Sequence, residues 1–214
     1  MRARTTLTPE AAQVQYVLAE GAESLNPRDL FANGSPLELD LGCGDGSFLT
    51  ALALEHPQRN FLGVERMIGR VRAACRKIAA RRLTNARIVR LEIGHVVASL
   101  IPADTVDICH IMFPDPWPKR RHHYRRTVTA ELLRAIYRVL KPSGTLRLTT
   151  DDVPYFEQMQ QAAAAVPELA TVSTDDEAPL PRSTFENRFV TTGTPIHRLV
   201  LRKVSPPRCG DASQ

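Results

Sequence analysis

Short apolar segments alternate with amphipathic segments along most of this chain, and that alternation restricts what it can fold into. Short segments at residues 37–41, 60–65, 86–91, 106–113 and 145–149 are predicted strands, and the segment 106–113 is apolar enough to be buried. Segments with apolar residues at helical spacing occupy 47–55, 67–83, 127–140 and 153–166. Strands that alternate with helices through short connections predict an α/β fold, with a mostly parallel central sheet covered by helices on both faces.

The rest of the chain is less regular. Its 214 residues, 43% of them hydrophobic, favour a single domain with a sizeable core. We expect an N-terminal extension over 1–35 with a short helix around 10–20, one domain over 36–204, and a disordered tail over 205–214. A short helical segment is expected at 96–101, a helix stop at 141–144, and a last strand at 196–204.

Acidic residues lie at or just after the predicted strand ends. They are Asp40, Glu65, Glu92, Asp115 and Asp151. In open α/β sheets, ligands bind outside the carboxyl ends of the strands. Five carboxylates on one rim therefore predict a binding site rather than a solvated surface.

A glycine-rich turn follows the first of these strands. It contains Gly42, Gly44 and Gly46, and Asp40 precedes it. Glycines let the backbone approach a ligand without an intervening side chain. The spacing GxGxG differs from the dinucleotide-binding GxGxxG, and the turn resembles motif I of class I S-adenosylmethionine-dependent methyltransferases. A nicotinamide-dependent oxidoreductase is a more distant alternative. Asp40 could hold the ammonium group of the cofactor.

Two further acids suit the rest of such a cofactor. Glu65 lies about 20 residues beyond the turn, where an acid can bind ribose hydroxyls. Glu92, at the end of the third strand, could accept a hydrogen bond from the adenine amino group. A helix cap or a surface charge is the alternative for each residue. For Glu92 this alternative is favoured over cofactor binding, whereas for Glu65 it is the weaker interpretation.

The segment 113–126 carries the most specific pattern, FPDPWPKRRHHYRR. Its three prolines fix their own φ angles and restrict the preceding residues, so Asp115 and Trp117 lie in a stiff turn. A rigid turn with a carboxylate and an aromatic ring suits a flat ligand that forms hydrogen bonds, such as a nucleobase. For Trp117, packing in the core and stacking on a base are both open.

A basic run follows this turn and accounts for the charge of the chain. The net charge is +5, and without this run the basic and acidic residues are equal in number. A basic patch on a balanced body is typical of a nucleic-acid-binding protein, although a solvated surface run is the alternative. The predicted phosphate contacts are Arg120, Arg121, Arg125 and Arg126, and Lys119 completes the run.

With FPDPWPK, His122 and the two arginines that follow, the sequence from about 37 to 203 resembles the bacterial tRNA (guanine-N7-)-methyltransferase family. Residues 150–155 and 184–188 agree with it. The resemblance implies S-adenosylmethionine as cofactor, tRNA as substrate and activity without an obligatory protein partner, as a monomer or homodimer. The cofactor contacts that it implies are Asp40, Glu65, Glu92 and Asp115. The substrate contacts that it implies are Lys119, Asp151, Ser183, Thr184, Phe185 and Glu186.

The chemistry of this reaction needs few groups. Guanine N7 carries a free lone pair at neutral pH, so no base is needed, but the methylated ring becomes positively charged. Asp115 could accept hydrogen bonds from the base edge and offset that charge, and Asp151 and Glu186 could hold the base or share this role. The alternatives are a methyltransferase for another nucleobase, since a DPPY-like turn is superficially similar, and a catalytically silent RNA-binding module.

Other classes of protein fit the sequence poorly. No apolar run is long enough to span a bilayer, and the N-terminus lacks the pattern of a signal peptide, so we expect a cytoplasmic protein. The histidines and cysteines show no metal-ligand spacing. The cysteines, which we expect to be free thiols, are Cys43, Cys75, Cys109 and Cys209.

Overall fold

The structure, a computed structural model, describes residues 6–173, 180–181 and 193–204. The strands are β1 Gln15–Tyr16, β2 Leu37–Leu41, β3 Asn60–Val64, β4 Ala86–Val89, β5 Val106–Met112, β6 Leu140–Thr150, β7 Leu169–Val172 and β8 His197–Lys203. The helices are α1 Pro9–Val14, α2 Pro27–Phe31, α3 Ser47–Glu55, α4 Ile68–Ala80, α5 Ile93–His95, the π-helical η1 Val96–Leu100, the 3-10 helix η2 Arg120–Arg125, α6 Ala130–Val139 and α7 Val153–Ala164.

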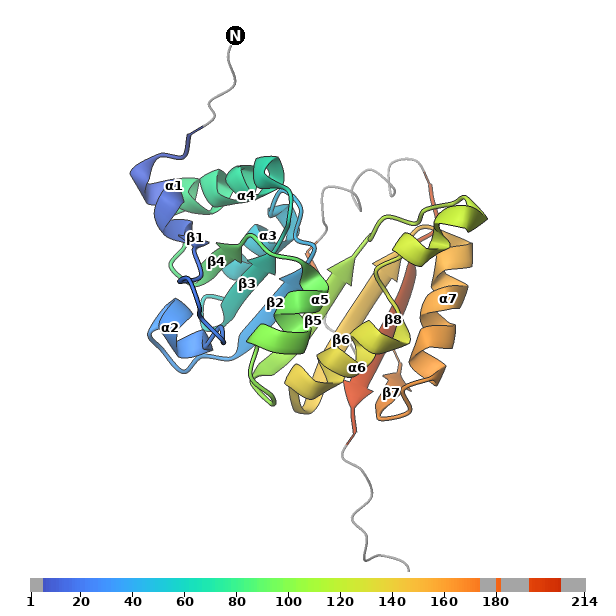
Figure 1. Cartoon of the computed structure of the whole chain (residues 1–214). Helices are drawn as coiled ribbons and strands as arrows, with labels where there is room; N and C mark the ends of the chain where they lie inside the picture. The colour runs from blue at the N-terminus through green and yellow to red at the C-terminus, as the bar shows by residue number, and fades with distance from the viewer. Residues whose placement is uncertain (1–5, 174–179, 182–192, 205–214) are drawn as a thin grey trace, which may run out of the picture.

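The strands form one eight-stranded sheet in the order β1-β4-β3-β2-β5-β6-β8-β7 (Figure 1). The pairs from β1 to β6 are parallel, and β8 runs antiparallel to both β6 and β7. The predicted fold class is therefore confirmed. From β2 the chain first builds outward through β3 and β4, and it then returns to build the other half from β5. That reversal leaves a crevice between β2 and β5 at their carboxyl ends.

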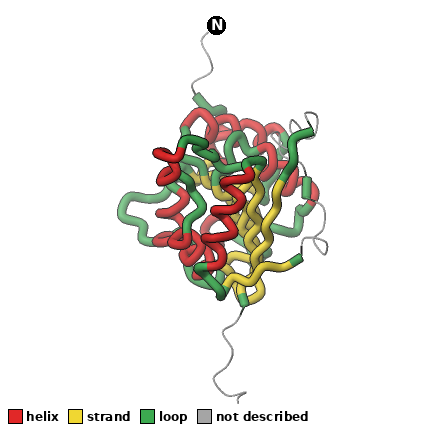
Figure 2. The backbone as a smooth tube through the Cα atoms, turned by 90° about the vertical axis from the view of Figure 1, so that its right-hand side faces the viewer, coloured by secondary structure: helices red, strands yellow, loops and turns green. Residues whose placement is uncertain are grey.

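Helices cover both faces of the sheet, as Figure 2 shows from the side. One core cluster joins α1, α3 and α4 to the sheet, and the other joins α2, η1, α6 and α7 to it. On α6 the four buried residues Leu132, Leu133, Ile136 and Val139 follow the helical period that the sequence predicts. The bounds of β2 and α3 also match the sequence prediction.

The N-terminal segment differs from its prediction. The helix expected around residues 10–20 ends at Val14, and Gln15 and Tyr16 then pair in parallel with β4. Thr8 caps the helix by accepting a hydrogen bond from the Ala11 N–H at 3.3 Å. Part of this segment thus adds an edge strand to the sheet. A two-residue strand is too short to give an alternating pattern, so the sequence carried no signal for it.

The predicted stop after α6 lies inside β6. The pairing with β5 passes from Leu140 directly to Thr145, so residues 141–144 bulge out of the ladder. Ser143 has a positive φ of 64°, and a Cβ on Gly144 would lie 2.8 Å from the Lys141 carbonyl oxygen. The turn predicted at residues 141–144 is therefore present, but it interrupts a strand instead of preceding one.

A buried hydrogen bond between two ionisable side chains connects β2 to β5 below the crevice. The Glu38 carboxylate lies 2.7 Å from His110 Nε2 and also contacts the Arg59 guanidinium. Burial lowers the pKa of His110, so a neutral imidazole donating its Nε2–H to Glu38 is the favoured state. This pair fixes the two strands on whose carboxyl ends the candidate site is built.

Candidate functional site

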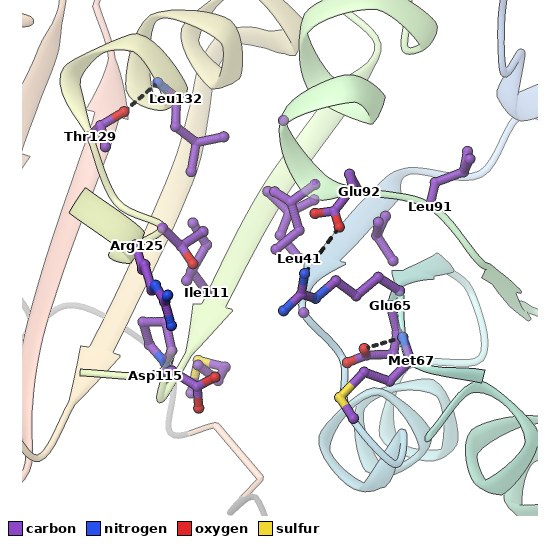
Figure 3. Close-up of a pocket in the computed structure, with 18 of the residues that line it drawn as sticks. Leu41, Glu65, Met67, Leu91, Glu92, Ile111, Asp115, Arg125, Thr129 and Leu132 are labelled. Atoms are coloured by element: carbon purple, nitrogen blue, oxygen red, sulfur yellow. Dashed lines mark hydrogen bonds and ion pairs between the residues drawn. The ribbon is translucent and has the colours of Figure 1, made fainter. Parts of the chain in front are cut away.

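A cleft of about 790 Å³ opens at the carboxyl ends of the parallel strands. Its size lies in the range of cofactor and ligand sites. Figure 3 shows its two walls, with Glu65 and Glu92 on one side and Asp115 and Arg125 on the other. The first wall comes from the ends of β2, β3 and β4, and the second from the end of β5 and the start of α6. The cleft thus lies at the point where the strand order reverses.

The glycine turn forms the floor at the end of β2. Gly42 lines the cleft with a φ of 90°, and Gly44 has a φ of 57°, conformations that glycine adopts without steric cost. Gly46 differs from the predicted role. It is buried, and a Cβ there would lie 2.7 Å from Ala74 Cβ, so it lets α3 pack closely against α4. Of the three predicted glycines, only Gly42 lines the cleft.

Glu65 joins the glycine turn to the first wall. It is 5% exposed, and its two oxygens accept hydrogen bonds from the Gly44 N–H at 3.2 Å and the Met67 N–H at 2.8 Å. Two backbone donors hold the carboxylate in place and orient it into the cleft. Each carboxylate oxygen can still accept a further hydrogen bond. The site thus offers a fixed acceptor where the sequence predicted a ribose contact.

Asp40 lies beneath the glycine turn, outside the cleft lining. It is 4% exposed, and within the described part of the chain its Oδ2 has no hydrogen-bond partner. Burial, and then the nearby Glu65 carboxylate, raise the pKa of Asp40 to about 7. An unpaired buried carboxylate oxygen beside a second carboxylate suits a cationic donor. The ammonium group of S-adenosylmethionine fits this requirement.

Two arginines, which the sequence reasoning missed, complete the first wall. Arg66 Nη1 lies 3.3 Å from Glu92 Oε1, and both side chains are 66% exposed. Arg70 Nη1 lies 3.9 Å from Glu65 Oε2. Arg66 directly follows Glu65, and Arg70 lies in the first turn of α4, so their closeness to the predicted strand end is the signal that could have found them. The exposed Arg66–Glu92 pair is weak, so Glu92 remains free to exchange its partner for a ligand.

The proline-rich turn forms the second wall after β5. The Phe113 N–H donates to the Thr149 carbonyl at 2.8 Å, which ties the turn to β6. Phe113 and Trp117 both have positive φ angles, 51° and 46°. Such angles are unfavourable for residues with a Cβ and persist only where the surroundings impose them. Between them Asp115 is exposed at the cleft, and Trp117 is half-buried in its lining.

The position of Arg126 contradicts the role that the sequence predicted for it. It was predicted to contact phosphate, but it is 4% exposed. Its guanidinium donates to the Pro116 carbonyl at 2.7 Å and to Gln158 Oε1 at 2.8 Å, and it lies 3.6 Å from Asp152 Oδ1. It also lies over the Tyr155 ring, 4.8 Å from the centroid. Arg126 therefore connects the proline-rich turn to the start of α7 and does not face solvent.

The other cations of the basic run are on the surface. Lys119, Arg120 and Arg121 are exposed and lie outside the cleft lining. Arg125 lines the cleft, with its guanidinium 4.9 Å from the Trp117 ring centroid. The run thus extends from the cleft across the adjoining surface, in the arrangement expected for a polyanion that reaches into the site.

The predicted substrate residues are only partly placed. Asp151 directly follows β6 and is half-buried, and it lies outside the cleft lining. Ser183, Thr184, Phe185 and Glu186 lie outside the described residues, as does Cys209. Their roles stay predictions.

No group of three or more potential metal ligands occurs among the residues that the structure describes. Cys43, Cys75 and Cys109 are free and buried. Burial raises the pKa of the Cys75 thiol to about 11, so it is an inert core thiol. In the same described ranges, no helix is long and apolar enough to cross a membrane.

Comparison with known families gives a match over most of the chain. The sequence model of a family described as "Putative methyltransferase" matches residues 34–199. That range contains the cleft and all of its lining residues.

Several curated proteins are similar over most of their length. One from Paracidovorax citrulli, named tRNA (guanine-N(7)-)-methyltransferase, is 36% identical, covering 95% of this chain and 85% of its own. Proteins of the same name from Leifsonia xyli subsp. xyli and Syntrophotalea carbinolica are 38% and 32% identical. They cover 81% and 92% of this chain, and 78% and 88% of their own.

Solved structures agree on the fold. The 16S rRNA methyltransferase KamB matches with a TM-score of 0.60 at 18% identity, covering 83% of this chain and 92% of its own. A Haemonchus contortus phosphoethanolamine N-methyltransferase in complex with S-adenosyl-L-methionine matches with a TM-score of 0.50 at 14% identity, covering 80% of this chain and 49% of its own. At these identities the likeness shows a common fold.

Proposed function

This chain belongs to the tRNA (guanine-N7-)-methyltransferase family, and we propose that it transfers a methyl group from S-adenosylmethionine to N7 of the variable-loop guanine in tRNA. The single observation that carries the proposal is the cleft, which brings the glycine turn and Glu65 opposite Asp115 at the strand reversal. The family resemblance drawn from the sequence is confirmed by the matches.

The first wall of the cleft is the side proposed for the cofactor. S-adenosylmethionine, when bound, supplies a methyl group on a positively charged sulfur. We assign its ammonium group to Asp40, its ribose hydroxyls to Glu65 and its adenine edge to Glu92. The backbone at Gly42 allows close approach, and the unpaired Asp40 oxygen gains a donor.

The second wall is the side proposed for guanine. Methylation of N7 requires its lone pair to lie in line with the methyl group, and it places positive charge on the ring. Asp115, exposed at the cleft on a stiff turn, can accept hydrogen bonds from the base edge and stabilise that charge. No proton has to leave N7, so the site needs no general base. We keep Lys119, Asp151 and Ser183 to Glu186 as proposed substrate contacts.

The experiment that tests this function is methyl transfer from labelled S-adenosylmethionine to an unmodified tRNA transcript, with the modified site mapped by N7-specific chain cleavage. We expect label at the variable-loop guanine. Label on another base would show that the enzyme methylates a different position, and tight tRNA binding without label would favour a silent RNA-binding module. We further propose that the protein acts in the cytoplasm, as a monomer or homodimer and without an obligatory protein partner.

The raised pKa of Asp40 gives a prediction for cofactor affinity. Protonated Asp40 cannot pair with an ammonium group, so affinity for S-adenosylhomocysteine should fall about tenfold per pH unit below about 7. Titration calorimetry from pH 5.5 to 7.5 measures this, and Asp40→Asn should bind weakly with little pH dependence. The folding stability of the ligand-free protein depends on pH in the opposite direction. Because burial favours the protonated carboxyl, the contribution of Asp40 to stability is lost as pH rises through about 7. Affinity that is flat in pH would contradict the assignment.

The exposed arginines give a prediction for salt dependence. The double substitution Arg120→Gln and Arg121→Gln should weaken tRNA binding and make the plot of log affinity against log salt shallower by about 1 to 2. Phosphate contacts release counterions, and removing two cations removes about that many. Fluorescence anisotropy at several salt concentrations measures the slope. Arg28→Gln, an exposed arginine on α2, is the control and should leave the slope unchanged.

A further inference from the structure

Tyr124 is a large aromatic side chain that packs against little of the fold. It lies on η2 and is 77% exposed. Aromatic rings carry a large apolar surface, and most of them are largely buried in folded proteins. Neither the proposed cofactor side nor the proposed guanine side of the cleft uses this ring.

The ring is nevertheless held in an ordered arrangement. The Arg125 guanidinium lies 5.4 Å from the Tyr124 ring centroid and 4.9 Å from the Trp117 ring centroid. Its Nε also donates to the Tyr124 hydroxyl at 3.1 Å. Trp117 in turn meets the His122 ring edge-on, with centroids 6.0 Å apart. One arginine therefore contacts both aromatic rings, and both contacts favour a fixed ring position.

The two rings that Arg125 contacts, Trp117 and Tyr124, extend from the cleft to the adjoining surface. Trp117 and Arg125 line the cleft, whereas Tyr124 lies outside the lining. Arg120 and Arg121 are exposed on the same short helix, and no acidic residue occurs between Asp115 and Glu131. The basic chain segment that carries Tyr124 therefore favours a polyanion and disfavours an acidic protein surface.

We propose that Tyr124 is a stacking site for an unpaired nucleobase next to the target guanine of the RNA substrate. The inference rests on the proposed function. A guanine that enters the cleft must leave its own stacking partners, which exposes the face of a neighbouring base. A ring outside the cleft, backed by a guanidinium and surrounded by cations, offers that base a new partner. Every base has such a face, so the site tolerates different sequences.

A double-mutant cycle between protein and RNA tests this directly. Tyr124→Ala should lower kcat/KM for tRNA by roughly 5- to 100-fold, and Tyr124→Phe should restore most of it. Transcripts with a single abasic nucleotide on either side of the target guanine supply the other half of the cycle. At one such position the abasic site should lower kcat/KM for the wild-type protein by a similar factor. The same abasic site should lower kcat/KM of the Tyr124→Ala variant little further.

Two controls separate stacking from other effects. Tyr124 is neutral, so Tyr124→Ala should leave the salt slope of tRNA binding unchanged, unlike the Arg120 and Arg121 substitutions. Val17→Ala, at an exposed apolar residue beside β1, should leave kcat/KM unchanged. The inference is overturned if Tyr124→Ala has full activity. It is also overturned if, at every abasic position, the fold-decreases in kcat/KM from the substitution and from the abasic nucleotide multiply, because the two changes then act independently. Either result, with N7 methylation by the wild-type protein, leaves the proposed function standing.

Discussion

Replacing Asp115 with asparagine is expected to lower kcat for tRNA methylation by about 100- to 1,000-fold. Asparagine keeps the size and one acceptor oxygen of the side chain, but it loses the charge that stabilises a positively charged guanine. Asp115 is exposed at the cleft, so the substitution should not unfold the protein. Single-turnover methyl transfer at saturating cofactor and tRNA measures the effect on the chemical step.

The effect should be confined to turnover. Affinity for tRNA should change only a few-fold, because the exposed cations provide most of the binding. Asp29→Asn, which removes an exposed carboxylate on α2, is the matched control and should be fully active. Near-normal turnover of Asp115→Asn, with unchanged tRNA affinity, would show that Asp115 is not the residue that stabilises the charge.

Replacing Arg126 with methionine is expected to lower both stability and turnover. The substitution leaves the Pro116 carbonyl and the Asp152 carboxylate without their guanidinium partner. Breaking a fully buried charge pair typically costs about 3–5 kcal/mol, and because the Asp152 side chain is 22% exposed we expect a cost at or below the lower end of that range. The turn that carries Asp115 also loses its tie to α7, so kcat should fall at least about tenfold under conditions where the variant is folded.

Two measurements separate these consequences. Urea unfolding gives the change in stability, and methyl transfer at low temperature gives the change in turnover of the folded variant. Arg121→Gln removes an exposed arginine five positions earlier and should leave the unfolding midpoint unchanged. A stable Arg126→Met with full activity would contradict the role of Arg126 in holding the turn.

The fold could be predicted from the sequence because its main signals are local and periodic. The buried residues of α6 follow the helical period, and β2 alternates leucines with acidic residues before it ends at the glycine turn. The candidate site followed from topology, since the carboxyl ends of parallel strands meet at one edge. Glu65, Glu92 and Asp115 therefore line one cleft as expected.

Other features depended on packing, which the sequence does not reveal. Arg125 and Arg126 are adjacent and chemically identical, yet one lies over Trp117 at the cleft and the other is buried against α7. The orientation of each residue in a short 3-10 helix and its cap depends on the neighbours that it meets. Asp40 is similar: its position at a strand end was predicted, but its burial beneath the glycine turn required the structure.

The most direct test of the account uses a tRNA transcript with 7-deazaguanine at the variable-loop target. This base keeps the Watson–Crick edge that Asp115 is proposed to bind, but a carbon replaces N7, so no lone pair is available for the methyl group. We predict that the transcript binds within a few-fold of the normal one and accepts no methyl group. Methyl transfer to that nucleotide at the normal rate would contradict reaction at N7.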